Sequence, residues 1–268
     1  MFYRAGLDIG SSLAKAVILK DDEIMAYGIA PISGNFSRAA DQVMQETLEK
    51  SGLRLEQLDI IGGTGLGASF IPYRFVKNTE VSCQSRGVHY LLPTARIVIE
   101  IGYQASRVIK ITENGKVADC VVNDRCAAGS GRILQVISKV LQVPLTELGN
   151  MSLKSTNPVR FTTGCSVFAE TEAISRIAEG AKVEDIIAGL HQAISLKISG
   201  MLEKIKLDGE CAITGGGGKD AGLVKMLEKT LQKEMLLPAE PLISGAIGAV
   251  LMATEKTQEF EAAAKQEE

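Results

Sequence analysis

The sequence predicts an α/β protein built from two similar domains with a cleft between them. Strand-like stretches alternate with helical patterns, and an antiparallel hairpin unit opens each half of the chain. The chain has 268 residues, of which 46% are hydrophobic, so it is long enough to bury a full core without disulfides. We expect the first domain to cover residues 1–92 and the second to cover residues 93–268.

Three short strands joined by tight turns begin each half. The expected strands are 5–9, 15–19 and 24–29 in the first half, and 96–102, 106–111 and 116–122 in the second. The tripeptide acid-Ile-Gly starts at Asp8 and again at Glu100, and a base, Lys15 or Arg107, stands seven residues after each acid. The offset of 92 positions (100 − 8) is longer than the repeats of a solenoid, so we interpret it as a domain duplication.

Helical patterns follow the strands in each half. Ile133, Leu134 and Ile137, for example, fall on one helical face. The other expected elements are a helix at 38–51, a strand at 58–62, a helical region at 167–205 interrupted near Gly180, a strand at 211–214, and helices at 221–233 and 244–254. The charged tail from Glu255 is expected either to extend the last helix or to fray.

Composition excludes several classes of partner. The formal net charge is −3, from 29 basic and 32 acidic residues, which gives no electrostatic footprint for a nucleic acid. No apolar run approaches the roughly 20 residues that cross a bilayer, and the N-terminus lacks the pattern of a signal peptide. We therefore expect a cytoplasmic protein with neither a nucleic acid nor a membrane as partner.

The two acid-Ile-Gly hairpins are candidate phosphate sites. A Gly-rich turn offers close backbone approach and N–H donors to a phosphate, and a carboxylate at the strand end holds a hydrated Mg²⁺. Either hairpin alone is typical of an ordinary strand-end turn, but the repetition favours two loops that clamp a nucleotide's phosphates from both sides. The expected catalytic acids are Asp8 and Glu100, and the expected phosphate contacts are Gly10, Ser11, Ser12, Lys15, Gly102 and Gln104.

A run of four glycines follows the strand expected at 211–214 and precedes a helix. Such a turn suits adenosine packing against the backbone, because a Cβ at these positions would block the ligand. We expect the contacts from Gly215, Gly216 and Gly217, since an ordinary strand-to-helix turn does not need four glycines. The sequence contains neither a P-loop motif nor a Gly-x-Gly-x-x-Gly linked to a strand and a ribose acid.

This combination of two phosphate hairpins and an adenosine turn resembles the acetate kinase, sugar kinase, Hsp70 and actin superfamily. The resemblance covers the whole chain. It implies two RNase H-like (actin/Hsp70-type) domains that hinge over ATP or ADP with Mg²⁺. Small residues at 245–249 are similar to those of the closing helices in that superfamily.

Five cysteines, at positions 83, 120, 126, 165 and 211, are too few and odd in number for a disulfide framework. Cys126 and Cys165 each stand just ahead of an expected helix, where unpaired N–H groups and the positive end of the helix dipole stabilise a thiolate. Their matched settings favour metal ligation. The other three, Cys83, Cys120 and Cys211, are expected to be buried structural residues.

The segments Cys-Ala-Ala-Gly-Ser-Gly-Arg at 126–132 and Cys-Ser-Val-Phe-Ala-Glu-Thr-Glu at 165–172 resemble the two cluster motifs of a specific family. This family comprises the activators of 2-hydroxyacyl-CoA dehydratases and the ATP-binding subunits of benzoyl-CoA reductases (BadF/BadG/BcrA/BcrD-type ATPases). The resemblance implies that Cys126 and Cys165 from each subunit of a dimer ligate one [4Fe–4S] cluster. It also places Gly129 and Gly131 among the cofactor-binding residues.

The same resemblance implies an ATPase coupled to electron transfer, which donates one electron at very low potential where oxygen is absent. The implied partners are a second copy or close paralogue, a dehydratase or reductase as electron acceptor, and ferredoxin or flavodoxin as electron source. Two cysteine ligands per chain cannot complete a four-cysteine cluster, so the cluster itself requires a dimer.

Two positions depart from the family pattern Asp-Ile-Gly-Gly-Gln-Asp. Tyr103 replaces a glycine and Ala105 replaces an acid, which leaves open whether this chain hydrolyses ATP or is the ATP-binding subunit of a heterodimeric benzoyl-CoA reductase. A small-molecule kinase is another alternative, but no acidic catalytic base stands out and the cysteine motifs stay unexplained. An ATP-gated binding protein with structural cysteines is a further one. His89 and His191 are interpreted as ordinary surface or packing residues.

Overall fold

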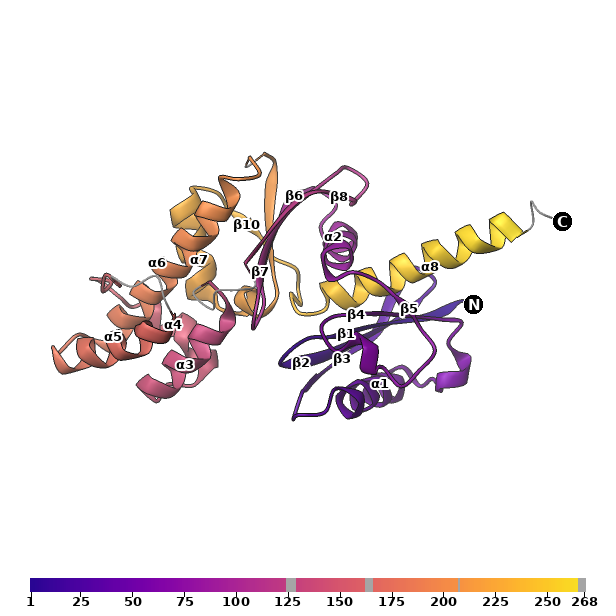
Figure 1. Cartoon of the computed structure of the whole chain (residues 1–268), viewed down its shortest axis with the longest axis horizontal. Helices are drawn as coiled ribbons and strands as arrows, with labels where there is room; N and C mark the ends of the chain where they lie inside the picture. The colour runs from indigo at the N-terminus through magenta and orange to yellow at the C-terminus, as the bar shows by residue number, and fades with distance from the viewer. Residues whose placement is uncertain (124–128, 162–165, 207, 265–268) are drawn as a thin grey trace. The chain divides into compact units, whose positions relative to one another are not determined.

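The computed structural model describes residues 1–123, 129–161, 166–206 and 208–264 and has the expected α/β fold. Two compact units each contain one five-stranded sheet (Figure 1). The first unit holds residues 1–93, 114–116 and 242 onward, and the second holds residues 94–113 and 117–241. The break after residue 93 lies close to the expected boundary. The final segment, expected in the second domain, belongs instead to the first unit.

In the first unit the strands are ordered β3-β2-β1-β4-β5. β1, β2 and β3 form an antiparallel meander, and β4 and β5 continue the sheet parallel to β1. The strands are β1 Tyr3–Ile9, β2 Leu13–Lys20, β3 Glu23–Pro31, β4 Ile60–Thr64 and β5 Val76–Lys77. They are accompanied by helices α1 Phe36–Ser51, α2 Glu80–Leu91 and α8 Ser244–Ala264, and by the 3-10 turns η1 Leu55–Gln57 and η2 Ala68–Phe70.

Apolar side chains project from both faces of this sheet, because successive residues of a strand point to opposite sides. Leu7 and Ile9 of β1 pack in one cluster with α1, whereas Val17 and Leu19 of β2 pack in another with α8. Figure 1 shows α1 on one side of the sheet and α2 with α8 on the other. The last helix belongs to the first unit because its apolar residues cover this second face. It continues to Ala264, so the charged tail extends the helix.

Small residues let α8 lie directly against the strands and against α2. A Cβ on Gly6 of β1 or on Gly62 of β4 would stand 1.9 Å or 2.0 Å from a backbone carbonyl oxygen of α8. A Cβ on Gly248 of α8 would stand 1.7 Å from the carbonyl oxygen of Cys83 in α2. A larger side chain at any of these positions would force the backbones apart, so the small residues at 245–249 serve close packing within this unit.

The second unit has the same strand order as the first, β8-β7-β6-β9-β10 against β3-β2-β1-β4-β5. Its strands are β6 Ala95–Ile101, β7 Ser106–Ile111, β8 Val117–Asn123, β9 Glu210–Thr214 and β10 Met235–Leu236. Its helices are α3 Gly131–Leu141, α4 Leu148–Ser152, α5 Ser166–Ala178, α6 Val183–Leu202 and α7 Ala221–Leu231, with 3-10 turns η3 Leu145–Glu147 and η4 Gly216–Lys219. This matching strand order confirms the domain duplication that the sequence predicts.

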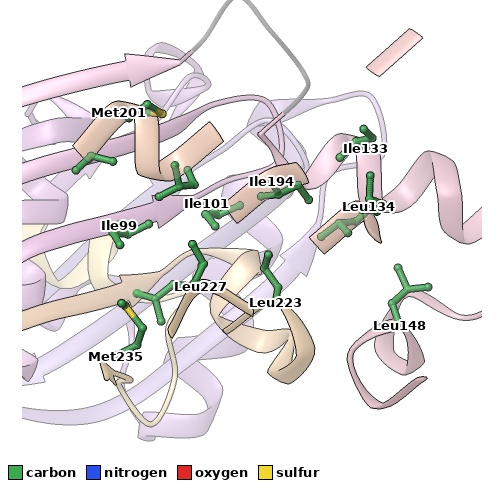
Figure 2. Close-up of a cluster of buried hydrophobic side chains, with 14 of the residues drawn as sticks. Ile99, Ile101, Ile133, Leu134, Leu148, Ile194, Met201, Leu223, Leu227 and Met235 are labelled. Atoms are coloured by element: carbon green, nitrogen blue, oxygen red, sulfur yellow. The ribbon is translucent and has the colours of Figure 1, made fainter. Parts of the chain in front are cut away.

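One hydrophobic core joins the sheet and the helices of the second unit. Figure 2 shows Ile99 and Ile101 of β6 beside Leu223 and Leu227 of α7, in a cluster that also takes side chains from α3 and α6. Gly180, with a φ of +83°, separates α5 from α6, as the interruption in the helical pattern predicts. No helix in the described ranges is both long and apolar enough to span a membrane.

The sequence does not predict helix α2. This helix contains the weak helix formers Ser82, Ser85 and Gly87, and a Cβ on Gly87 would stand 1.8 Å from the Ser244 carbonyl oxygen of α8. Its start does carry a recognisable cap, since Thr79 Oγ1 accepts a hydrogen bond from the Ser82 N–H at 3.3 Å. Thr79 followed by Glu80 in the first turn is the sequence feature from which the start of this helix could have been predicted.

Candidate nucleotide site and cysteine motifs

Asp8 stands near the end of β1, directly opposite Lys15 of β2 in the antiparallel register. The Lys15 ammonium donates to Asp8 Oδ2 at 3.0 Å, and the two side chains are 12% and 10% exposed. The turn between the strands is closed by the Gly10 N–H, which donates to the Leu13 carbonyl at 3.0 Å. The structure thus brings together the acid, the base and the glycine that the sequence predicts at the first phosphate site.

Two glycines from other elements make room for the Asp8 carboxylate. A Cβ on Gly65, just after β4, would stand 2.7 Å from Asp8 Oδ1, and a Cβ on Gly245, in the first turn of α8, would stand 2.8 Å from Oδ2. Gly65 also has a φ of +95°, which favours glycine. The carboxylate therefore lies against a helix N-terminus, where unpaired backbone N–H groups favour negative charge.

The second hairpin repeats this ion pair. Glu100 is opposite Arg107 in the β6–β7 register, and Arg107 Nη1 donates to Glu100 Oε2 at 2.7 Å. The two side chains are again 12% and 10% exposed. The Gly102 N–H closes the turn by donating to the Ala105 carbonyl at 2.9 Å. The duplication therefore extends from the strand order to the individual ion pair and turn hydrogen bond.

The second turn makes contacts that the first does not, because it is attached to the start of helix α3. The N–H of Gly131 donates to the Gly102 carbonyl at 2.8 Å, and the N–H of Arg132 donates to the Tyr103 carbonyl at 2.9 Å. These two N–H groups belong to the first turn of α3, which has no intrahelical acceptors for them. The backbone of Tyr103, which replaces a glycine of the family pattern, therefore helps to cap a helix.

A third bond strengthens this attachment, since the Ser106 hydroxyl donates to the Gly129 carbonyl. Ser106 is fully buried. Gly129 and Gly131, predicted from the family resemblance to be cofactor-binding residues, thus both bond to the second hairpin. Gln104, another predicted contact, is exposed in the turn.

The four-glycine run follows β9, as expected, and leads through η4 into α7. At three of these four positions, neighbouring atoms of the protein leave no room for a side chain. A Cβ on Gly215 (φ +74°) would stand 2.6 Å from the Ile101 carbonyl oxygen, one on Gly217 2.6 Å from Ile101 Cβ, and one on Gly218 2.9 Å from Pro241 Cβ. Of the four, Gly216 alone has open space at the Cβ position. The turn's own packing therefore explains three of the glycines, which the sequence reasoning attributed to a ligand.

The same turn occurs in the first unit. The sequence predicts a glycine turn at 62–65 after the strand 58–62, but does not show that it corresponds to the turn at 214–218. Thr64 is paired with Asp8 in the β1–β4 register, as Thr214 is paired with Glu100 in the β6–β9 register. A Cβ on Gly67 would stand 2.6 Å from Ile9 Cγ2, which matches the contact between Gly217 and Ile101. The two turns lie 150 positions apart (214 − 64), because additional helices separate β8 from β9. A search at the offset of 92 therefore could not detect this part of the duplication.

The two predicted cluster ligands, Cys126 and Cys165, lie outside the described residues. Helix α5 begins at Ser166, directly after Cys165, and α3 begins at Gly131, shortly after Cys126. Both cysteines therefore precede helices, as the sequence predicts. Within the described ranges, no group of three or more His, Cys, Asp or Glu side chains is arranged to hold a metal ion.

The other three cysteines, Cys83, Cys120 and Cys211, are free thiols. Burial raises the pKa of the Cys83 thiol to about 12, and it also raises the pKa of Cys120 and of Cys211. Cys83 and Cys211 are fully buried, and Cys120 is half-buried on the edge strand β8. Raised pKa values disfavour the thiolate, which is the form that reacts and binds metals.

A family model described as the BadF/BadG/BcrA/BcrD ATPase family matches residues 5–253. The chain belongs to this family. The match includes both hairpins, the glycine turn and both cysteine motifs, so the resemblance noted from the motifs is confirmed. The matched range spans elements of both units, so both belong to the fold of this ATPase family.

Similar proteins extend over nearly the whole chain. The 2-hydroxyisocaproyl-CoA dehydratase activator of Clostridioides difficile is 35% identical over 257 residues, which cover 96% of this chain and 97% of the relative. A benzoyl-CoA reductase component of Thauera aromatica is 30% identical over 263 residues, which cover 94% and 93%. A solved structure of the Clostridium difficile activator with bound ADPNP has a TM-score of 0.92 at 35% identity, with 98% of each chain covered.

Proposed function

We propose that this protein is an ATP-dependent electron donor that activates a 2-hydroxyacyl-CoA dehydratase or a related reductase. The proposed cofactor is one [4Fe–4S] cluster per dimer, held by Cys126 and Cys165 of each subunit. The observation that carries the proposal is the set of hydrogen bonds joining the second acid-Ile-Gly hairpin to residues 129–132, the end of the first cysteine motif. Similarity to dehydratase activators supports the same role.

The proposed nucleotide site uses the two ion-paired acids and the glycine turn. Asp8 and Glu100 would hold a hydrated Mg²⁺, with Lys15 and the predicted turn residues Gly10, Ser11, Ser12, Gly102 and Gln104 next to the phosphates. The N–H groups of Gly10 and Gly102 already close their own turns, so the phosphate donors of the first turn are those of Ser11 and Ser12. Gly216, which has open space at its Cβ position, is the best placed of Gly215, Gly216 and Gly217 to approach an adenosine.

The hydrogen bonds of the second hairpin offer a route between nucleotide and cysteine motif. A phosphate that shifts the Gly102–Tyr103 backbone also shifts its two partners in the first turn of α3. Ser106 transmits the same movement to the carbonyl of Gly129, three residues after Cys126. When bound, a [4Fe–4S] cluster supplies one electron at a time, taken from ferredoxin or flavodoxin and given to the dehydratase or reductase partner. ATP hydrolysis to ADP and phosphate would reset the hairpin.

A second candidate is the ATP-binding subunit of a heterodimeric benzoyl-CoA reductase. Tyr103 and Ala105 favour it, because they remove a glycine and an acid from the second phosphate turn. Similarity to the benzoyl-CoA reductase component of Thauera aromatica supports this alternative at a lower identity than the activator. In that assembly a paralogous chain would supply the other two cysteines, and both candidates place the protein in a reducing cytoplasm.

The test is anaerobic purification of the chain alone, with iron and sulfide measured together with the mass of the native particle. A dimer with about four iron atoms supports an activator. A monomer that gains iron only when a paralogous chain is co-expressed supports the heterodimeric reductase. A colourless protein that takes up no iron after anaerobic reconstitution in either setting contradicts the proposed function.

A further inference from the structure

Helices α4, α6 and α7 of the second unit enclose a polar cluster that the proposed function does not use. His191 of α6 is fully buried. Its Nδ1 lies 3.0 Å from Ser152 Oγ of α4, and its Nε2 lies 3.2 Å from Asp220 Oδ2 at the start of α7. Burying three polar side chains costs free energy of folding unless they are paired with one another. The contacts of these three side chains therefore matter for the stability and geometry of the helices that carry them.

Ser152 and Asp220 each have a second hydrogen-bond partner besides their contact with His191. The Ser152 hydroxyl lies within hydrogen-bond distance of both the Gly149 carbonyl and His191 Nδ1, at 3.0 Å each, so it can pair with either tautomer of the imidazole. Asp220 Oδ1 accepts from the Leu223 N–H at 2.9 Å, which caps α7. This leaves Asp220 Oδ2 facing His191 Nε2 at 3.2 Å.

The surrounding packing leaves the triplet no freedom to rearrange. A Cβ on Gly149 would stand 2.7 Å from Asp220 Oδ1, and a Cβ on Gly222 would stand 2.0 Å from Ser152 Oγ. Helices α4 and α7 therefore approach each other most closely around the side chains of Ser152 and Asp220. Replacing a buried pair by apolar groups is often neutral or stabilising, so the pair fixes geometry more than it adds stability.

Asp220 connects this cluster to the glycine turn. It ends the 3-10 turn η4 and begins α7, and its own N–H donates to the Gly217 carbonyl at 3.2 Å. At the other end of the turn, the Gly215 N–H donates to the Pro241 carbonyl at 2.9 Å. Gly216, the glycine with open space, lies between these two fixed points.

We propose that His191 is a positioning residue for the adenosine end of the nucleotide site, acting through Asp220. The proposal rests on the proposed placement of adenosine at Gly215–Gly217. His191 does not touch the nucleotide. It fixes the Asp220 carboxylate, which sets where the glycine turn ends and α7 begins, and so holds the open backbone at Gly216 in place for the ligand. Sequence reasoning interpreted the same residue as ordinary packing.

The experiment measures the affinity of His191→Leu and the unmodified protein for two probes, Mg-ATP and Mg-tripolyphosphate. Tripolyphosphate has the phosphates of ATP without adenosine, so it reports the hairpins alone. We expect His191→Leu to weaken ATP binding about tenfold, as for the loss of one buried polar contact, with tripolyphosphate affinity unchanged. His191→Gln, which keeps a donor toward Asp220, should restore ATP affinity to within about twofold of the unmodified protein.

A matched control is Asn35→Ala, which removes a side-chain cap of the same kind from α1 in the first unit. Asn35 Oδ1 accepts from the Arg38 N–H at 2.9 Å, and its loss should change neither affinity. Should His191→Leu fail to fold, Ser152→Ala serves in its place, with an expected loss for ATP of about threefold and none for tripolyphosphate.

Equal ATP affinity in a folded His191→Leu protein would overturn the proposal, as would an equal loss for both probes. For Ser152→Ala, unchanged ATP affinity has the same meaning. A different outcome, in which the unmodified protein binds tripolyphosphate as tightly as ATP, would refute the adenosine site and with it this part of the proposed function.

Discussion

The two acid-Ile-Gly hairpins share a framework and differ in what their turns contact. Each has an acid paired with a base across the strands, at 3.0 Å and 2.7 Å, and a glycine N–H that closes the turn. The first turn is bonded to its own meander, where the Ile32 N–H donates to the Ser12 carbonyl at 2.9 Å. The second turn is bonded to α3 instead. The two units therefore share the strands and their ion pairs, whereas their turns make different contacts.

We therefore propose that the first hairpin acts mainly on the phosphates and the second mainly in transmission to the cysteine motif. The first turn keeps Gly10 and two serines, which suit a phosphate, and its acid lies against the first turn of α8. In the second turn, Tyr103 and Ala105 occupy positions where the family pattern has a glycine and an acid. Variants of the cysteines, the acids and the turns test this division of labour, beginning with the largest expected effect.

Cys126→Ser and Cys165→Ser should each abolish iron binding, because either change removes two of the four ligands of a shared cluster. Mg-ATP affinity should change by less than about twofold, since the hairpins are untouched. Cys211→Ser is the matched control, because the Cys211 thiol is fully buried in the core and burial raises its pKa. Normal iron content in either cluster variant would contradict the assignment of that ligand.

Asp8→Asn and Glu100→Gln compare the two acids directly. Each amide keeps an oxygen for its basic partner and removes the charge that would hold Mg²⁺, so we expect ATP turnover to fall about a hundredfold for Asp8→Asn. For Glu100→Gln we expect a loss of about tenfold, because the second turn is assigned mainly to transmission. Turnover measured with an anaerobic phosphate-release assay tests this order. Equal losses would show that the hairpins act as equivalent clamps.

Gly216→Ala and Gly217→Ala separate ligand approach from internal packing. A Cβ at Gly216 meets open space in the protein, so Gly216→Ala should fold normally and weaken ATP binding about tenfold where adenosine packs there. A Cβ at Gly217 would clash with Ile101, so Gly217→Ala should destabilise the second unit by about 1–3 kcal/mol. Thermal melting and ATP titration distinguish the two. Unchanged ATP affinity in Gly216→Ala would remove adenosine from this turn.

Ser106→Ala removes the side-chain bond from the second hairpin to Gly129. We expect ATP affinity within about twofold of the unmodified protein and a smaller nucleotide-induced change in the cluster's EPR spectrum. Ser138→Ala is the control, since the Ser138 hydroxyl makes a similar bond to the Val143 carbonyl at the far end of α3. An undiminished spectral response in Ser106→Ala would show that the coupling follows another path.

Much of this arrangement could be predicted from the sequence. The acid-Ile-Gly repeat located both hairpins. The base seven residues after each acid belongs to the same repeat, but the ion pairs that it forms become visible only in the structure, where the register sets acid and base opposite each other. The helix break at Gly180 and the start of the last helix also followed from local patterns, whereas the sequence leaves open whether that helix extends beyond 254.

Other features depend on tertiary contacts that a linear pattern does not contain. The last helix joins the first unit because it covers a sheet face that is distant in sequence, and α2 contains Gly87 because α8 lies against it there. The glycines of the 214–218 turn suggested a ligand, whereas Ile101 and Pro241 account for three of them. His191 resembled a packing residue because its partner Asp220 is 29 positions away (220 − 191).

The central claim, that nucleotide at the hairpins is coupled to a [4Fe–4S] cluster, is tested most directly by EPR spectroscopy of the anaerobically purified, dithionite-reduced protein. The account predicts a reduced-cluster signal that integrates to about one spin per two chains and changes shape when Mg-ATP is added. A signal that is identical with and without Mg-ATP, or no cluster signal in protein that binds ATP, would contradict it.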